Sequence, residues 1–151
     1  MDITANNLST KAIHAFVEEE KKRKVEEQRK HEAAAKAERE KLHQAFLKEE
    51  VPADAMDRVA QMVRRAVERD EKQVLVFQFP SDWLPDQGRS ITNRAVDWHE
   101  HLDGFARRAY AYFERELEPR GFQLRAEILD WPGGVPGDVG FFLRWKRPEE
   151  T

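Results

Sequence analysis

The amino-acid sequence predicts an α+β protein in which a long charged N-terminal helix precedes a compact α-β-α-β-β domain. The three-stranded, mainly antiparallel sheet of that domain is expected in the strand order 2-3-1. All seven Pro and all seven Gly lie at or after Pro52, and 13 of the 15 aromatic residues follow position 50. Residues 1–50 instead carry 11 acidic and 11 basic side chains. We therefore expect a helical arm at 1–50, a compact domain at 51–148 and a tail at 149–151.

The composition excludes several classes of protein. A chain of 151 residues suits one domain with an appendage. It contains no Cys, which excludes disulfides, thiol catalysis and cysteine-ligated zinc. A net charge of -3 lacks the basic field of a general nucleic-acid binder. No apolar run reaches the ~18 residues of a membrane span and no signal-peptide pattern opens the chain, so we expect a cytoplasmic protein without membrane contact.

The arm is predicted as one helix that Ser9 or Thr10 caps and that continues to Pro52 without Gly or Pro. Between positions 18 and 41, 17 of 24 residues are charged. Five Glu residues each precede a Lys or Arg by four positions, and each such pair stabilises a helix by about 0.2–0.5 kcal/mol. No heptad frame keeps apolar a and d positions. A solvated single helix, a helix that pairs at its ends, and a partly disordered tail all remain open.

Residues 54–70 are predicted as a second helix, whose start Asp54 can cap. Its apolar side chains recur every three or four positions and share one face: Met56, Val59, Ala60, Val63, Ala66 and Val67. Residues 74–79 form a β-branched and aromatic run that Pro80 ends, which is the pattern of a buried strand. Residues 81–91 follow as a turn-rich loop.

A third helix is predicted over residues 92–118, because apolar side chains keep to steps of three and four until Pro119. Residues 122–129 alternate apolar and polar side chains, as an edge strand does. Residues 139–145 are apolar on both faces, which is typical of a central strand. Placing this last strand between the other two gives the order 2-3-1 with antiparallel neighbours.

The segment 97–103 holds the side chains that most suggest metal binding. His99 and His101 are two positions apart, and on a helix they would point about 200° away from each other, so they cannot bind one ion together. The usable pairs would be Asp97 with His101 and His99 with Asp103, and a zinc site would need further carboxylates. We expect no metal and no other cofactor, and His99 and His101 remain the alternative ligands.

No catalytic constellation stands out elsewhere. Ser81, Ser90 and Thr92 lie in or beside the turn-rich loop, but none sits in a Gly-x-Ser-x-Gly turn. Gly133 and Gly134 precede a strand, so they lack the helix N-terminus that binds phosphate. The sequence favours a protein that is not an enzyme, and a metal-dependent enzyme built around the two His residues is the catalytic alternative.

Four arginines are the candidate contacts to nucleic acid: Arg64, Arg65, Arg89 and Arg94. Arginine beside an exposed aromatic ring can hold single-stranded bases. Acidic side chains are interleaved with these arginines throughout the domain, which favours ordinary surface charge. A small regulatory nucleic-acid binder is therefore the alternative function.

The candidate partner-binding residues are apolar side chains that the predicted elements leave uncovered. Leu8, Ile13, Phe16 and Val17 share one face at the start of the arm, where that face either binds a partner or folds back onto the domain. Trp83 and Trp131 lie in turn-rich loops, where aromatic rings either bind partners or cover a core. We expect a non-catalytic interaction module (a scaffold, adaptor, assembly component or inhibitor) that binds a protein partner or self-associates.

Overall fold

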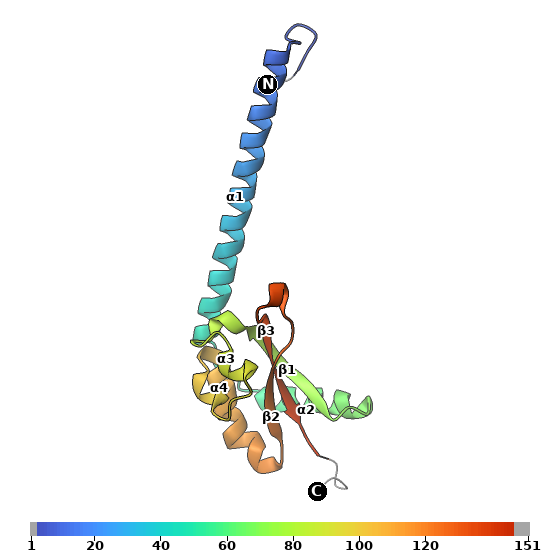
Figure 1. The fold of residues 1–151 in the computed structure, drawn as a ribbon. Helices are drawn as coiled ribbons and strands as arrows, with labels where there is room; N and C mark the ends of the chain where they lie inside the picture. The colour runs from blue at the N-terminus through green and yellow to red at the C-terminus, as the bar shows by residue number, and fades with distance from the viewer. Residues whose placement is uncertain (1–2, 147–151) are drawn as a thin grey trace. The chain divides into compact units, whose positions relative to one another are not determined.

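The computed structural model describes residues 3–146 (Figure 1). In chain order its main elements are α1 (Thr10–Lys48), α2 (Ala55–Glu68), β1 (Gln73–Pro80), α3 (Arg89–Thr92), α4 (Gly104–Tyr112), β2 (Gln123–Ile128) and β3 (Asp138–Arg144). The chain divides into two compact units, Met1–Gln44 and Ala45–Thr151. No described helix combines the length and the apolar character that crossing a bilayer requires. The predicted tail at 149–151 lies outside the described residues.

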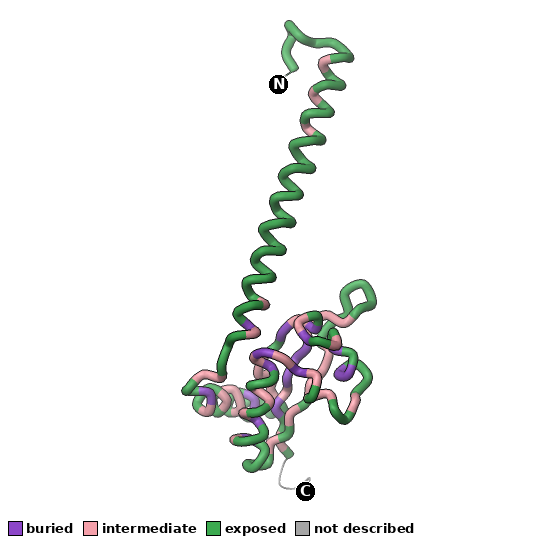
Figure 2. Tube along the Cα trace, turned by 90° about the vertical axis from the view of Figure 1, so that its left-hand side faces the viewer, coloured by how far each residue is buried: buried purple, intermediate pink, exposed green. Residues whose placement is uncertain are grey.

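The first unit is helical from Thr10 onward, and the hydroxyl of Ser9 accepts a hydrogen bond from the amide of Ala12 at 3.0 Å. That contact confirms the predicted cap. α1 has 39 residues, which corresponds to about 58 Å of helix. Every residue from 21 to 42 is exposed, as the green tube in Figure 2 shows.

Ion pairs along the helix stabilise this exposed stretch. Glu20 pairs with Arg23 at 2.6 Å and Glu26 with Arg29 at 2.9 Å, so these pairs span three positions rather than the predicted four. Arg23 also reaches Glu27, four positions further on, at 3.3 Å.

The second unit contains the sheet, whose order β1-β3-β2 with antiparallel neighbours is the predicted 2-3-1 order. β3 is the central strand, and the side chains of β1 and β2 flank its own side chains on each face of the sheet. Val139, Phe141 and Leu143 are at most 1% exposed and face α2 and α4. Phe142 points to the opposite face and is only half-buried.

The last turn of α1 belongs to the core of this second unit. Phe46 is 5% exposed, and its ring centre lies 5.1 Å from that of Phe79 and 5.0 Å from that of Trp83. Arg108 donates hydrogen bonds to the carbonyl oxygens of Leu47 at 3.0 Å and of Glu49 at 2.7 Å, which satisfies backbone groups at the helix end. The second compact unit begins at Ala45, so the last residues of α1 belong to it.

The helix predicted over residues 92–118 is wrong in its first half. The structure has the short helix α3, a 3₁₀ turn at Trp98–His101, and then α4, which begins only at Gly104. Arg94 adopts a positive φ of 52°, and Leu102 is extended, so the backbone leaves the helical region twice. Periodicity could not reveal these breaks because the apolar side chains still reach one core from successive short turns.

Asp54 also differs from its prediction. It precedes α2, but its side chain makes no capping hydrogen bond and pairs with Arg58 at 3.0 Å. The carboxylate therefore stabilises the first turn of α2 through an ion pair instead of a cap.

Candidate functional site

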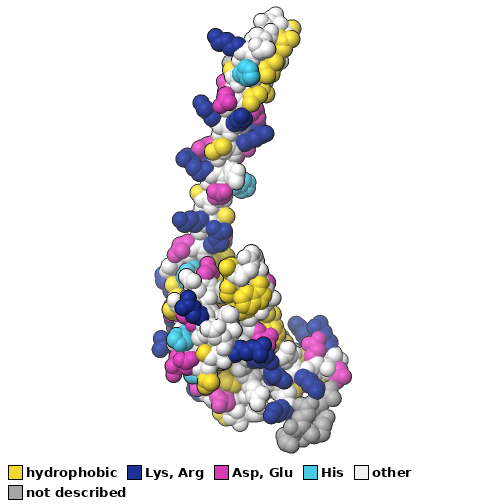
Figure 3. All heavy atoms as spheres, viewed as in Figure 1, with side chains coloured by type: hydrophobic (Ala, Val, Ile, Leu, Met, Phe, Trp, Pro, Cys, Tyr) yellow, Lys and Arg dark blue, Asp and Glu magenta, His cyan; other side chains and the backbone are white. Residues whose placement is uncertain are grey.

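The apolar face at the start of α1 is exposed, as the yellow side chains along the first turns of the helix show (Figure 3). Leu8 is 66% exposed, Ile13 39% and Val17 40%, and Phe16 is half-buried. The hydrophobic effect favours covering such a face, which exceeds the scattered single apolar residues of an ordinary surface.

The second unit has a groove of about 540 Å³ beside the free edge of its sheet. One wall is β2, from Leu124 to Ile128, and the other is the segment 91–98, with Trp131 also lining the groove. This wall forms because α3 packs beside β2 while the chain turns back at Arg94. The result is a channel that runs along an unpaired strand.

The hydrogen-bonding direction of β2 follows from one contact at its end. The amide of Leu129 donates to the carbonyl of Asp138 at 2.8 Å, so residue 129 faces β3. Successive residues of an antiparallel strand face alternate sides, and residues 127 and 125 therefore face β3 as well. The backbone N–H and C=O groups of Leu124, Ala126 and Ile128 point away from β3, and these three residues line the groove.

The side chains of β2 separate by polarity onto the two faces of the sheet. Leu124, Ala126 and Ile128 pack against the buried core. Arg125 and Glu127 lie on the other face and form an ion pair at 2.8 Å. The strand thus combines apolar, charged and hydrogen-bonding groups in one accessible edge.

The two loop tryptophans have different environments. Trp83 is half-buried against the core beside Phe46, so it covers the core. Trp131 is 52% exposed and lines the groove. Of the two, only Trp131 is placed where a partner could contact most of its ring.

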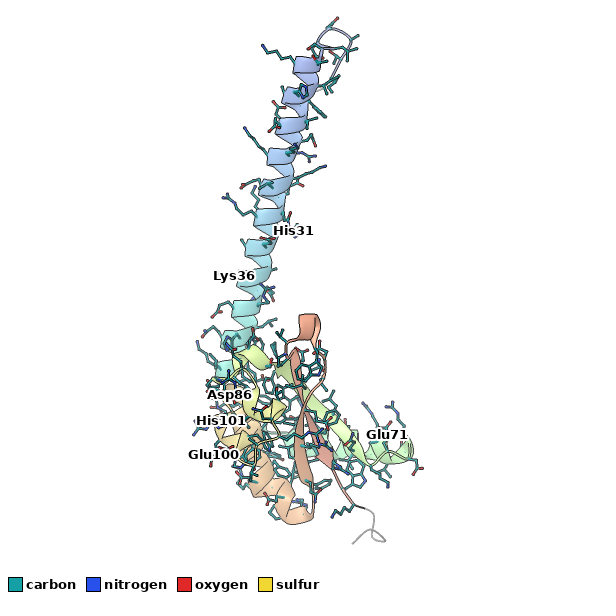
Figure 4. All side chains as sticks on the ribbon, in the orientation of Figure 1. His31, Lys36, Glu71, Asp86, Glu100 and His101 are labelled. Atoms are coloured by element: carbon teal, nitrogen blue, oxygen red, sulfur yellow. The ribbon has the colours of Figure 1, made fainter. Side chains whose placement is uncertain are left out.

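The histidines of the 97–103 segment lie on the 3₁₀ turn. His99 stacks on Tyr110 with ring centres 4.7 Å apart, and His101 lies 3.5 Å from Asp97. Figure 4 shows His101, Glu100 and Asp86 on the same side of the unit. Among residues 3–146, no group of three His, Asp or Glu side chains is arranged to hold a metal ion.

Asp86 is a structural carboxylate of the turn before α3. Its two oxygens accept hydrogen bonds at 3.0 Å from the amides of Gly88 and Ser90. Burial alone would raise its pKa, but the hydrogen bonds from Ser90 and Gly88 and the nearby charge of His101 outweigh burial and lower the pKa below its ordinary value. The side chain is therefore ionised at neutral pH, which stabilises the turn.

The four candidate arginines lie on two separate parts of the unit. Arg64 and Arg65 are on α2, which packs beside β1, and Arg64 pairs with Glu68 at 3.2 Å. Arg89 begins α3, and Arg94 follows it beside β2. Arg89 and Arg94 thus belong to one segment beside β2, whereas Arg64 and Arg65 lie on α2 beside β1, and β3 separates these two strands.

No protein-family model, curated protein or solved structure matches the chain. Sequence reasoning identified β2 as an edge strand but missed the groove, because all of the wall at 91–98 except residue 91 lies in the segment predicted as continuous helix. The alternation of Leu124, Arg125, Ala126, Glu127 and Ile128 was the available signal.

Proposed function

We propose that the protein is a non-catalytic protein–protein interaction module, acting as a scaffold, adaptor, assembly component or inhibitor. The observation that carries the proposal is the apolar face at the start of α1, on which Leu8, Ile13 and Val17 are exposed beside the half-buried Phe16. An amphipathic helix start of this kind binds by laying its apolar side chains into a groove of another protein.

The occupant that best fits this face is a different protein. Two copies of α1 have no continuous apolar seam through which to pair, because residues 18–41 are mostly charged and residues 21–42 are exposed. A groove on a partner needs to cover only the first turns of the helix. The first turns of α1 would then be buried on binding, while the rest of the helix stays hydrated. We call this apolar start of α1 the recognition arm.

Position-specific photo-crosslinking in the cells of origin tests the proposal. A benzophenone side chain replaces Phe16 in the full chain, and a matched control carries the same group at Arg29, which is exposed on the charged stretch of α1. We expect one dominant protein adduct from position 16 and little from position 29. Equal adducts from both positions, or none from either, would contradict the proposal.

A further inference from the structure

The two edge strands of the sheet, β1 and β2, differ in how readily another strand can pair with them. The register of β1 against β3 shifts between Leu75 and Phe77, and β1 ends at Pro80. Bulges and prolines at an edge prevent another strand from adding there. β2 pairs in a continuous register from Gln123 to Ile128 and contains no proline. Only β2 therefore presents a regular edge for an additional strand.

The groove determines the chemistry of a strand that would pair with β2. On the core-facing side the strand needs apolar side chains opposite Leu124 and Ile128 and a small one opposite Ala126. On the other side it needs an acidic side chain opposite Arg125 and a basic one opposite Glu127. Opposed residues of antiparallel strands have Cβ atoms about 4.5–5.5 Å apart, so opposite charges stabilise the pairing and like charges destabilise it.

The chain's own β2 meets each of these requirements when it runs antiparallel to itself. We infer that two copies of the protein associate through β2, with a two-fold axis at Ala126 that joins their sheets into one. Leu124 then lies opposite Ile128 of the second copy, and Ala126 lies opposite its counterpart. Arg125 lies opposite Glu127 of the second copy, and the symmetry repeats this pair.

The backbone supports the same register. Leu124, Ala126 and Ile128 are the residues whose N–H and C=O groups point away from β3, and in this register they face one another across the two-fold axis. Each facing pair exchanges two hydrogen bonds. The groove of about 540 Å³ is lined by the same residues of β2, so free space lies beside the strand.

Neighbouring registers with the same hydrogen-bonding direction are disfavoured by charge. Moving the two-fold axis by one residue toward the N-terminus places Arg125 opposite Arg125 of the second copy. Moving it by one residue toward the C-terminus places Glu127 opposite Glu127 of the second copy. The ion pair already present between Arg125 and Glu127, at 2.8 Å, extends in the favoured register into a network of four alternating charges.

This association uses a different surface from the apolar face at the start of α1. The double variant Ile13→Ser with Phe16→Ser is therefore expected to remain a dimer. A failure of the β2 pairing would leave the proposed recognition arm untouched, and the two ideas are tested separately.

Sedimentation equilibrium of the full chain tests the inference. We expect the wild-type protein to be a dimer, and Arg125→Glu and Glu127→Arg each to shift it to monomer by placing like charges opposite each other. The combined variant Arg125→Glu with Glu127→Arg restores opposite charges and is expected to restore the dimer. Arg64→Glu, which makes the same charge change on α2, is the control and should remain dimeric.

Ala126→Pro removes an N–H group that points away from β3, so the fold should tolerate it while the dimer is lost.

Amide exchange by NMR gives a measurement on the unmodified protein: the amides of Leu124, Ala126 and Ile128 should gain protection as the protein concentration rises. A monomeric wild-type protein, a dimer that survives Arg125→Glu, or a double swap that stays monomeric would overturn the inference.

Discussion

The carbonyl oxygen of Phe46 lies against Gly104, so close that a methyl group on Gly104 would stand 2.9 Å from it. Gly104 has a positive φ of 56°, and its amide is held by the side chain of Asp103 at 2.8 Å. The start of α4 therefore depends on glycine for two reasons: the backbone conformation and the close approach of α1. This contact places the end of α1 inside the second unit.

Gly104→Ala should lower the free energy of unfolding by about 1–3 kcal/mol, because the added methyl group forces the backbone of Phe46 to move. Gly133→Ala is the matched control: its φ of 63° is similar, but nothing lies within 4 Å of the added methyl group. Urea unfolding of both variants measures the difference. Equal losses would show that only the backbone conformation matters at Gly104.

Phe46→Ala should destabilise the second unit by about 3–5 kcal/mol, the usual loss for a buried aromatic ring. Leu42→Ala, one turn earlier on α1, should change little because Leu42 is 51% exposed. Thermal unfolding followed by near-ultraviolet circular dichroism compares the two variants.

A fragment that begins at residue 51 should melt lower than one that begins at residue 45, because the shorter fragment lacks the buried ring of Phe46.

The two adjacent phenylalanines of β3 should respond differently to truncation. Phe141 is fully buried beneath Phe77 and Trp98, so Phe141→Ala should cost about 3–5 kcal/mol of unfolding free energy. Phe142 is half-buried on the opposite face, and Phe142→Ala should cost distinctly less. Chemical denaturation of both variants gives the comparison, and a larger loss at Phe142 would reverse the assignment of the faces.

The lowered pKa of Asp86 predicts a specific pH dependence of stability. Because the pKa is lower in the folded than in the unfolded state, the stabilisation is present above the unfolded pKa and is lost as the pH falls through the folded value. Unfolding free energy should therefore decline on acidification below about pH 4. Asp86→Asn should be less stable at neutral pH and show a shallower acid decline, with Asp82→Asn as the charge control. Parallel pH curves for wild type and Asp86→Asn would contradict this role.

The strand order of the sheet could be predicted from sequence because its central and edge strands differ in their pattern of apolar and polar residues. The run Phe141, Phe142, Leu143 indicated a central strand, and the alternation over residues 122–129 indicated an edge; the observed order follows from these two facts. The break at Gly104 could not be predicted, since it depends on the close approach of Phe46 from the end of α1. Phe46 is remote in sequence from Gly104, and no local pattern indicates that the two residues meet.

The candidate site was predictable to a similar extent. Exposure of Leu8, Ile13 and Val17 agrees with the expectation that the charged stretch cannot cover them, since those side chains follow a local pattern. Trp83 and Trp131 had equivalent sequence surroundings, yet Trp83 packs on the core because Phe46 and Phe79 are beside it. The groove depends on tertiary packing of α3 against β2, which no local pattern encodes.

The recognition arm is tested most directly by measuring affinity for the protein that the crosslinker at position 16 captures. The variant that is measured is the double change Ile13→Ser with Phe16→Ser. The protein captured at position 16 is titrated against wild type, the double variant and a control, Lys24→Ser with Gln28→Ser, from the charged stretch of α1. We expect the double variant to lose at least tenfold in affinity, about 1.4 kcal/mol, at an unchanged melting temperature, and the control to bind normally. A double variant that melts markedly lower and still binds its partner would contradict the account, because those side chains would then belong to a core.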